Sequence, residues 1–210
     1  MGTSLASGFF IEPFSMLCNE VPGLPIELFR REACSMPTDS ACDLFLDFSR
    51  NKLLNQYWPR LRKAVEPLSQ EQIWWRPNEA SNSIGNLILH LNGNVWQWLV
   101  ASFNRLQDER NRPAEFSATG DLSAADLLAR LRQTMDEASK VLARLTSEEL
   151  LATWNIQGYT VSGLAAVYQV VEHFGLHYGQ IVYITKMQEG RDLGFYASLN
   201  KTGRATGGTV

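Results

Sequence analysis

Residues 171–181 read VEHFGLHYGQI and lie inside a long apolar segment that predicts one buried helix. His173 and His177 are four residues apart in it, so they share a helix face about 6 Å apart, and both imidazoles can reach one ion. The chain has only three histidines. The third, His90, lies in a second apolar segment, Ile84 to Phe103, which also predicts a helix.

Three imidazoles from two facing helices would form a facial set of nitrogen ligands. Such a set leaves coordination positions open for water or substrate, which is typical of catalytic rather than structural metal sites. Neutral imidazole suits zinc or nickel, with iron or manganese as alternatives. The competing interpretation is three ordinary histidines, hydrogen-bonded in the core or at the surface. Because the chain has no other histidine and all three lie in apolar segments, we predict a site for a divalent metal ion.

Four amphipathic helical patterns follow one another along the chain. Pro67 ends the first, Ser123 opens a capping box before the third, and Gly190 suits a left-handed cap after the fourth. The only weak candidate for a strand is the stretch 159–161. The patterns cover roughly residues 40–66, 84–106, 124–145 and 160–189. We therefore predict an all-α four-helix bundle.

The first 37 residues do not fit these patterns, because four prolines interrupt every helical run there. We predict an N-terminal extension over residues 1–37 and the bundle, with a C-terminal tail, over residues 38–210. Two interpretations of the extension stay open. The bundle begins near Met36, or the extension is an arm whose phenylalanines pack on the bundle or on a partner.

Composition limits the classes of function. The net charge of −3 comes from dispersed charges, so no basic surface for nucleic acid or anionic lipid is indicated. The longest apolar stretches are broken by polar residues, so we predict no membrane span. The start of the chain lacks a basic signal-peptide region, which makes the cytoplasm the default location. Three cysteines form neither a disulfide framework nor a metal cluster of their own.

Several neighbours of the histidines suggest supporting roles. Asn86 and Asn94 lie one turn either side of His90, and Gln180 lies three residues after His177. Each is expected to hold an imidazole or a metal-bound water by a hydrogen bond; the alternative for the asparagines is a solvent-facing or interhelical position. Four glycines surround the histidines and indicate close approach of helix backbones there. They are Gly85, Gly93, Gly175 and Gly179.

Two strings together resemble the DinB superfamily: SIGNLILHL, residues 83–91, and VEHFGLHYGQI, residues 171–181. The resemblance extends from about residue 39 to residue 196 and includes the segment GRDLGFY, residues 190–196. It implies a four-helix bundle, often a homodimer, with a divalent metal held by His90, His173 and His177. Some members of the superfamily transfer or use low-molecular-weight thiols, and many have no known activity.

The leading hypothesis is therefore a metal-dependent thiol transferase or hydrolase that takes a low-molecular-weight thiol and a small electrophile. A divalent ion lowers the pKa of a bound thiol or water and so favours the nucleophilic anion. A second hypothesis is a non-catalytic metal-binding or stress-response protein. A third is a dimerisation module whose histidines bind no metal.

Overall fold

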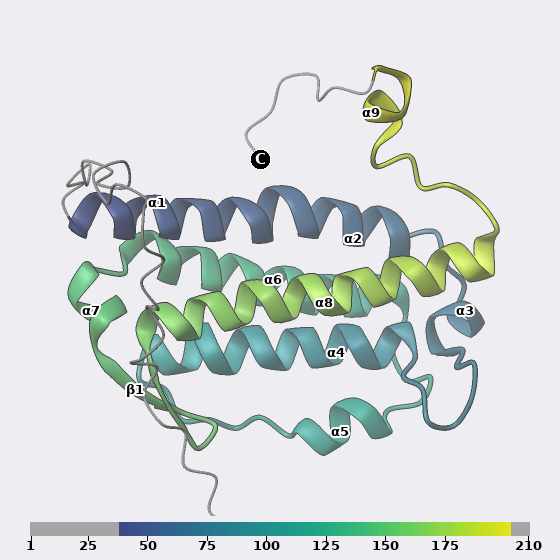
Figure 1. The fold of residues 1–210 in the computed structure, drawn as a ribbon. Helices are drawn as coiled ribbons and strands as arrows, with labels where there is room; N and C mark the ends of the chain where they lie inside the picture. Colours follow the sequence, from purple (N-terminus) through teal and green to yellow (C-terminus); the bar gives the residue numbers. More distant parts are fainter. Residues whose placement is uncertain (1–37, 203–210) are drawn as a thin grey trace, which may run out of the picture. The chain divides into compact units, whose positions relative to one another are not determined.

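A computed structural model describes residues 38–202, all of which belong to one compact unit spanning Met36–Val210. The predicted extension, residues 1–37, and the end of the predicted tail, residues 203–210, lie outside the described residues. The predicted mainly helical bundle is confirmed (Figure 1). The helices are α1 (Thr38–Asn51), the π-helix η2 (Lys52–Tyr57), α2 (Trp58–Val65), α3 (Gln70–Trp74), α4 (Ile84–Val95), the π-helix η3 (Trp96–Ala101), α5 (Arg112–Ser117), α6 (Ala124–Arg144), α7 (Ser147–Leu151), α8 (Gly163–Glu189) and α9 (Ala197–Thr202).

Four long helices form the bundle: α1–η2–α2, α4–η3, α6 and α8 (Figure 1). The helices α4 and α6 run in the same direction, since the connection containing α5 returns along the bundle before α6 begins. Hydrogen bonds support this course at both ends. The indole of Trp74, in α3 just before α4, donates to the carbonyl of Leu122 just before α6, at 2.9 Å. At the other end, Arg144 donates to the carbonyl of Phe103 at 3.0 Å.

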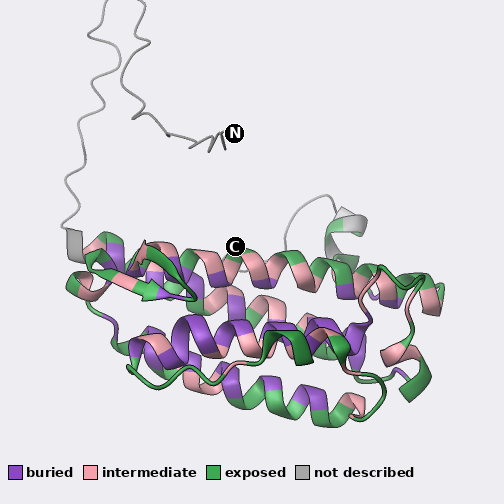
Figure 2. Ribbon diagram, turned by 90° about the horizontal axis from the view of Figure 1, so that it is seen from below, coloured by how far each residue is buried: buried purple, intermediate pink, exposed green. Residues whose placement is uncertain are grey.

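The core lies between these four helices, and buried residues gather on the sides that face one another (Figure 2). Helix α4 and the π-helix η3 contribute most of their residues to it. Removal of this apolar surface from water is the main stabilising term of such a bundle. Fully buried side chains from the four helices include Leu61, Leu91, Leu99, Leu131, Met135 and Phe174.

The long helices begin and end at capping residues that can be recognised in the sequence. The predicted capping box at Ser123 is present, with its hydroxyl accepting from the Asp126 amide at 3.2 Å and the Asp126 carboxylate accepting from the Ser123 amide, also at 3.2 Å. The Ser162 hydroxyl caps α8 by accepting from the Ala165 amide at 3.1 Å. Gly190 ends α8 at φ 62°, in the left-handed region that favours glycine.

A β-hairpin precedes α8 and was indicated only by the weak strand candidate at residues 159–161. Its strands are β1 (Thr153–Ile156) and β2 (Tyr159–Ser162), paired antiparallel with Ile156 opposite Tyr159. The two-residue turn has positive φ at both positions, 54° at Gln157 and 84° at Gly158. That is the type I′ turn, whose twist matches the strands. The strands are short and largely exposed, so neither shows the strict apolar alternation that predicts a strand.

Two apolar residues of the first helix lie outside the core: Leu44 and Phe48 are 59% and 47% exposed. The π-helix η2 that follows α1 adds a residue to the helical turn, so the apolar spacing before it no longer projects onto the same face as the spacing after it. No helix among residues 38–202 combines the length and apolar character that crossing a bilayer requires.

Two glycines of α8 should respond oppositely to alanine. A Cβ at Gly163 would lie 2.9 Å from the Leu150 Cα and would clash with the backbone carbonyl of Glu149, whereas a Cβ at Gly179 would meet nothing within 4 Å. We expect Gly163→Ala to lower the free energy of unfolding by about 1–3 kcal/mol. Gly179→Ala should raise it by about 0.5–1 kcal/mol, because alanine loses less entropy in a helix. Urea unfolding of both variants measures this, and a Gly163→Ala variant as stable as Gly179→Ala would contradict the packing described for the start of α8.

Candidate metal centre

The structure brings the three histidines together across α4 and α8. The Nε2 atom of His173 lies 3.1 Å from Nε2 of His90 and 3.1 Å from Nε2 of His177. All three ligand atoms lie within 4.8 Å of one another. His90 is buried, at 4% exposure, and the other two are half-buried. Three nitrogens from two elements therefore face one small volume at the edge of the core.

This arrangement fits a metal ion better than hydrogen bonds among the rings. An imidazole nitrogen has one position in the ring plane, occupied by either a proton or a lone pair, so Nε2 of His173 cannot make two good hydrogen bonds at once. Nitrogens bound about 2.0–2.1 Å from one ion, at angles between octahedral and tetrahedral, lie about 2.8–3.4 Å apart. The two separations of 3.1 Å fall in this range. The group can therefore hold a divalent metal ion.

Hydrogen bonds at Nδ1 fix the tautomer of two rings. The carboxylate of Glu115 accepts from Nδ1 of His90 at 2.8 Å, and the side-chain carbonyl of Gln180 accepts from Nδ1 of His177 at 2.7 Å. With the proton on Nδ1, the lone pair lies on Nε2, the atom that faces the other rings. A carboxylate behind a ligating histidine also raises its basicity. Gln180 is one of the three neighbours singled out from the sequence.

A buried ion pair holds the Glu115 carboxylate in place. Arg110 donates from Nε to Oε1 at 2.7 Å and from Nη2 to Oε2 at 2.9 Å, a two-pronged contact. Gln97, buried in η3, accepts from Nη1 of the same arginine at 2.8 Å. Burial disfavours the charged carboxyl, but the hydrogen bonds from Arg110 and His90 outweigh it and hold the pKa of Glu115 below its usual value. Glu115 therefore faces His90 as an anion.

Gly93 makes room for this ion pair. It lies one turn after His90, and a Cβ there would clash with the carboxylate of Glu115 and lie 2.7 Å from Nε of Arg110. Close approach is also present at Gly85, where a Cβ would lie 2.8 Å from the Trp74 ring, and at Gly175, where it would lie 2.8 Å from the Tyr57 hydroxyl. The approach expected at the fourth glycine, Gly179, is not present. At these three positions side chains, rather than a second backbone, occupy the space.

Asn86 supports the centre indirectly. It is fully buried and completes the capping box at the start of α4 with Ser83. Its Nδ2 donates to the backbone carbonyls of Glu115 at 2.9 Å and Ala118 at 3.0 Å. The hydrogen bonds of Asn86 thus anchor α5 to α4 and contribute to placing Glu115 behind His90, instead of joining Asn86 to an imidazole.

Asn94 lines a cavity of about 700 Å³ that reaches His90 and His173 between α4 and α8. The side chain is 3% exposed, and its Oδ1 has no hydrogen-bond partner among the described residues. It lies near the centre but makes no bond to a ring there. An unsatisfied buried polar atom costs about 1–3 kcal/mol, so this amide is placed to meet a further group in the cavity.

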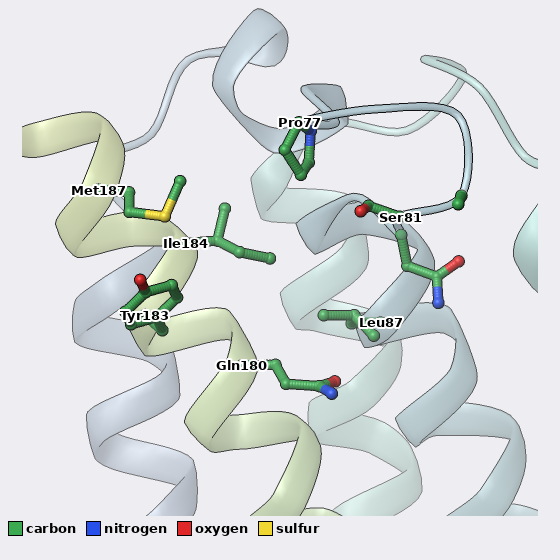
Figure 3. A pocket seen from close by; sticks show the side chains of 9 residues that line it. Pro77, Ser81, Leu87, Gln180, Tyr183, Ile184 and Met187 are labelled. Atoms are coloured by element: carbon green, nitrogen blue, oxygen red, sulfur yellow. The ribbon is translucent and has the colours of Figure 1, made fainter.

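Gln180 also borders a second, smaller cavity of about 350 Å³ between the start of α4 and the end of α8 (Figure 3). Apolar side chains of Leu87, Ile184 and Met187 line much of it, and the amide of Gln180 points across toward α4. The same side chain accepts a hydrogen bond from His177, whereas none of the three imidazoles lines this cavity. The larger cavity is therefore the one that reaches the histidines directly.

Glu115 and Arg110 were not identified from the sequence as residues of the centre. Both lie in the stretch 107–120 that reads as a charged loop, and the carboxylate is 25 residues away from the imidazole that it contacts. A local signal was present: Asn111, followed by Arg112 and Pro113, is a helix start, with an N-cap residue and proline in the first turn. That signal predicts α5, but it does not reveal that α5 packs on α4 beside His90.

Burial favours the neutral form of His173 and His177. It lowers the pKa of His173 to about 3, with repulsion from His177 and His90 as further causes. Burial likewise lowers the pKa of His177, against the hydrogen bond that His177 donates to Gln180, which favours the charged form. Neutral imidazoles with free Nε2 lone pairs are the form that binds metals.

The fold and the centre define a class: a four-helix bundle with three inward-facing histidines on two antiparallel helices. The chain belongs to the DinB superfamily, since residues 53–181, more than half of the chain, match the family. The predicted family is thus confirmed. No curated protein is similar enough in sequence to match.

Solved structures agree with the fold. A conserved protein from Enterococcus faecalis superposes with a TM-score of 0.59 at 14% identity, over 69% of this chain and 97% of that one. A DinB-like protein from Bacillus cereus superposes with a TM-score of 0.52 at 14% identity, over 65% of this chain and 88% of that one. At this identity the likeness shows the shared fold.

The hydrogen bonds at Nδ1 predict the tautomer of the metal-free protein. His90 and His177 should carry their proton on Nδ1, which long-range proton–nitrogen NMR spectra distinguish directly from Nε2. In Glu115→Ala, His90 should lose this preference while His177 keeps it, because Gln180 is untouched. An Nε2-protonated His90 in the unaltered protein would contradict the hydrogen-bond assignment.

Proposed function

We propose that this protein binds one divalent metal ion, zinc or nickel ahead of iron or manganese, through Nε2 of His90, His173 and His177. The convergence of the three Nε2 atoms is the observation that carries the proposal. Glu115 and Gln180 are positioning residues, since each accepts a hydrogen bond from the Nδ1 of one ring and so turns its Nε2 lone pair toward the common point. Family membership supports the same donor set.

We further propose that the centre serves thiol transfer or hydrolysis with a low-molecular-weight thiol and a small electrophile. A bound divalent ion supplies charge that favours thiolate or hydroxide over thiol or water near neutral pH. The cavity of about 700 Å³ beside His90 and His173 has the size of a small-molecule site. The buried rings keep neutral nitrogens available, and the surrounding helices limit access of water from the core side.

Metal content tests the donor set. In untagged protein purified without added metal, His173→Ala or His177→Ala should remove most of the bound ion, because two imidazoles hold a divalent ion far more weakly than three. Glu115→Gln should retain the ion but weaken binding by about 10–100-fold, the usual effect of losing the partner behind a ligating histidine. Elemental analysis and competition with a chromogenic chelator measure both effects.

The matched control is Glu172→Gln, which removes a negative charge beside His173 from an exposed side chain with no hydrogen bond to a ring among the described contacts. Its affinity should stay within about threefold of the unaltered protein. Unchanged metal content in a variant with all three histidines replaced by alanine would refute the metal centre.

Thiol binding tests the proposed chemistry. Cobalt-substituted protein should develop a sulfur-to-cobalt charge-transfer band when titrated with small thiols, because open coordination positions accept an exogenous thiolate. The band should be absent in His177→Ala. A rate with monobromobimane that depends on bound metal would establish transfer. If no thiol changes the cobalt spectrum, the thiol chemistry is refuted. The second hypothesis drawn from the sequence, a non-catalytic metal-binding protein, is then retained.

The homodimer, the absence of nucleic-acid binding and the cytoplasmic location stay predictions. One feature supports the dimer: α8 carries a row of exposed apolar side chains, which are Leu164, Tyr168, Leu176, Tyr183 and Met187. Sedimentation velocity of the full chain should give twice the mass of 23.6 kDa. Leu176→Glu should shift the mass toward the monomer, and a monomer for the unaltered chain would contradict the prediction.

A further inference from the structure

The cavity beside the histidines presents several polar atoms that lack partners. Asn94 Oδ1, Gln169 Oε1 and His173 Nδ1 are buried without a hydrogen-bond partner among the described residues, and all three side chains line this cavity. With its Nε2 lone pair turned to the metal position, His173 carries the proton on Nδ1 and can donate there. The wall thus offers two amide oxygens and one N–H group that a ligand can satisfy.

Charge in the cavity favours an anion. Its lining includes Arg110 and Arg112 but no carboxylate within residues 38–202. Arg110 is neutralised by Glu115, at 2.7 Å. Arg112 lies over the ring of Phe116, 4.9 Å from its centroid, and forms no ion pair among the described contacts. Its guanidinium is therefore available to a carboxylate of a ligand, a pairing for which its fork of donors is suited.

The remaining wall is aromatic and comes from the hairpin and η3. The indole of Trp98 donates to the side-chain carbonyl of Gln157 at 3.1 Å, which fixes the turn of the hairpin over the cavity. Tyr159 lies beside Trp98, with ring centroids 6.2 Å apart. These rings add an apolar surface to the polar atoms that line the cavity.

We propose that the cavity binds a small carboxylate that carries an amide group, such as an N-acylated amino-acid thiol. The carboxylate pairs with Arg112, the amide N–H donates to Asn94 or Gln169, and the amide carbonyl accepts from Nδ1 of His173. The sulfur then reaches the side of the cavity where the Nε2 atoms converge. This assignment rests on the proposed function for the thiol, but its polar contacts do not require the sulfur.

Four probes, tested on full-length metal-loaded protein, distinguish the contributions of the sulfur, the carboxylate and the amide to binding. N-Acetylcysteine has sulfur, carboxylate and amide; 3-mercaptopropionate lacks the amide; 2-mercaptoethanol lacks both; N-acetylalanine lacks the sulfur. The cobalt charge-transfer band reports the thiols, and calorimetry reports N-acetylalanine. N-Acetylcysteine should bind at least about tenfold more tightly than 2-mercaptoethanol, the effect of one charge-assisted hydrogen bond.

Two variants identify the residues. Arg112→Gln should weaken N-acetylcysteine and N-acetylalanine by about tenfold and leave 2-mercaptoethanol unchanged. Asn94→Leu should weaken N-acetylcysteine, which carries the amide, and leave 3-mercaptopropionate, which lacks it, unchanged. Arg62→Gln is the control, because it removes another exposed positive charge, which lines a different cavity. Its affinities should match those of the unaltered protein.

The outcomes distinguish this inference from the proposed function. If thiols bind cobalt but N-acetylcysteine gains nothing over 2-mercaptoethanol, or if Arg112→Gln changes nothing, the carboxylate–amide assignment is overturned and the thiol chemistry stands. If N-acetylalanine binds in an Arg112-dependent way while no thiol perturbs cobalt, the assignment stands and the thiol chemistry fails.

Discussion

The hydrogen bond from His90 to Glu115 is the interaction on which the centre depends. A neutral imidazole can place its proton on either nitrogen, and only the Nδ1-protonated form directs its lone pair at the other two rings. The carboxylate selects that form, and it remains charged in a buried position because Arg110 grips both of its oxygens. A buried carboxylate without such a partner would favour protonation.

Much of the surrounding structure serves this one contact. Gly93 leaves space for the ion pair against α4, Gln97 holds Arg110 from behind, and Asn86 anchors α5 through backbone carbonyls. The chain returns along the bundle between α4 and α6, so these two helices run in the same direction (Figure 1). The returning segment contains α5, whose Glu115 contacts His90. The long connection between the second and third helices is therefore part of the centre and not merely a linker.

The sequence was sufficient for the bundle and for the three histidines, because both follow from short-range periodicity. Apolar residues at helical spacing place faces inward, and the spacing of His173 and His177 places both rings on one face. The same logic led to Gln180, three residues from its partner. Asn86, by contrast, lies on the expected face, but its hydrogen bonds are made with the N-cap residue Ser83 and with the backbone of α5.

What the sequence could not provide depends on contacts between distant segments. Nothing local to Glu115 or Arg110 indicates that they pack on α4, and the hairpin wall of the cavity is built from exposed strands with no apolar alternation. Leu44 and Phe48 lie outside the core for a related reason: a π-helical segment changes the helical phase, and no residue pattern in that stretch indicates it.

X-ray absorption spectroscopy of the zinc-loaded, full-length protein tests the central claim most directly, since it counts and identifies the donor atoms around the ion. The account predicts three imidazole nitrogens at about 2.0–2.1 Å, with oxygen donors completing the coordination and no sulfur before a thiol is added. Fewer than three imidazoles, or a sulfur donor supplied by the protein itself, would contradict it.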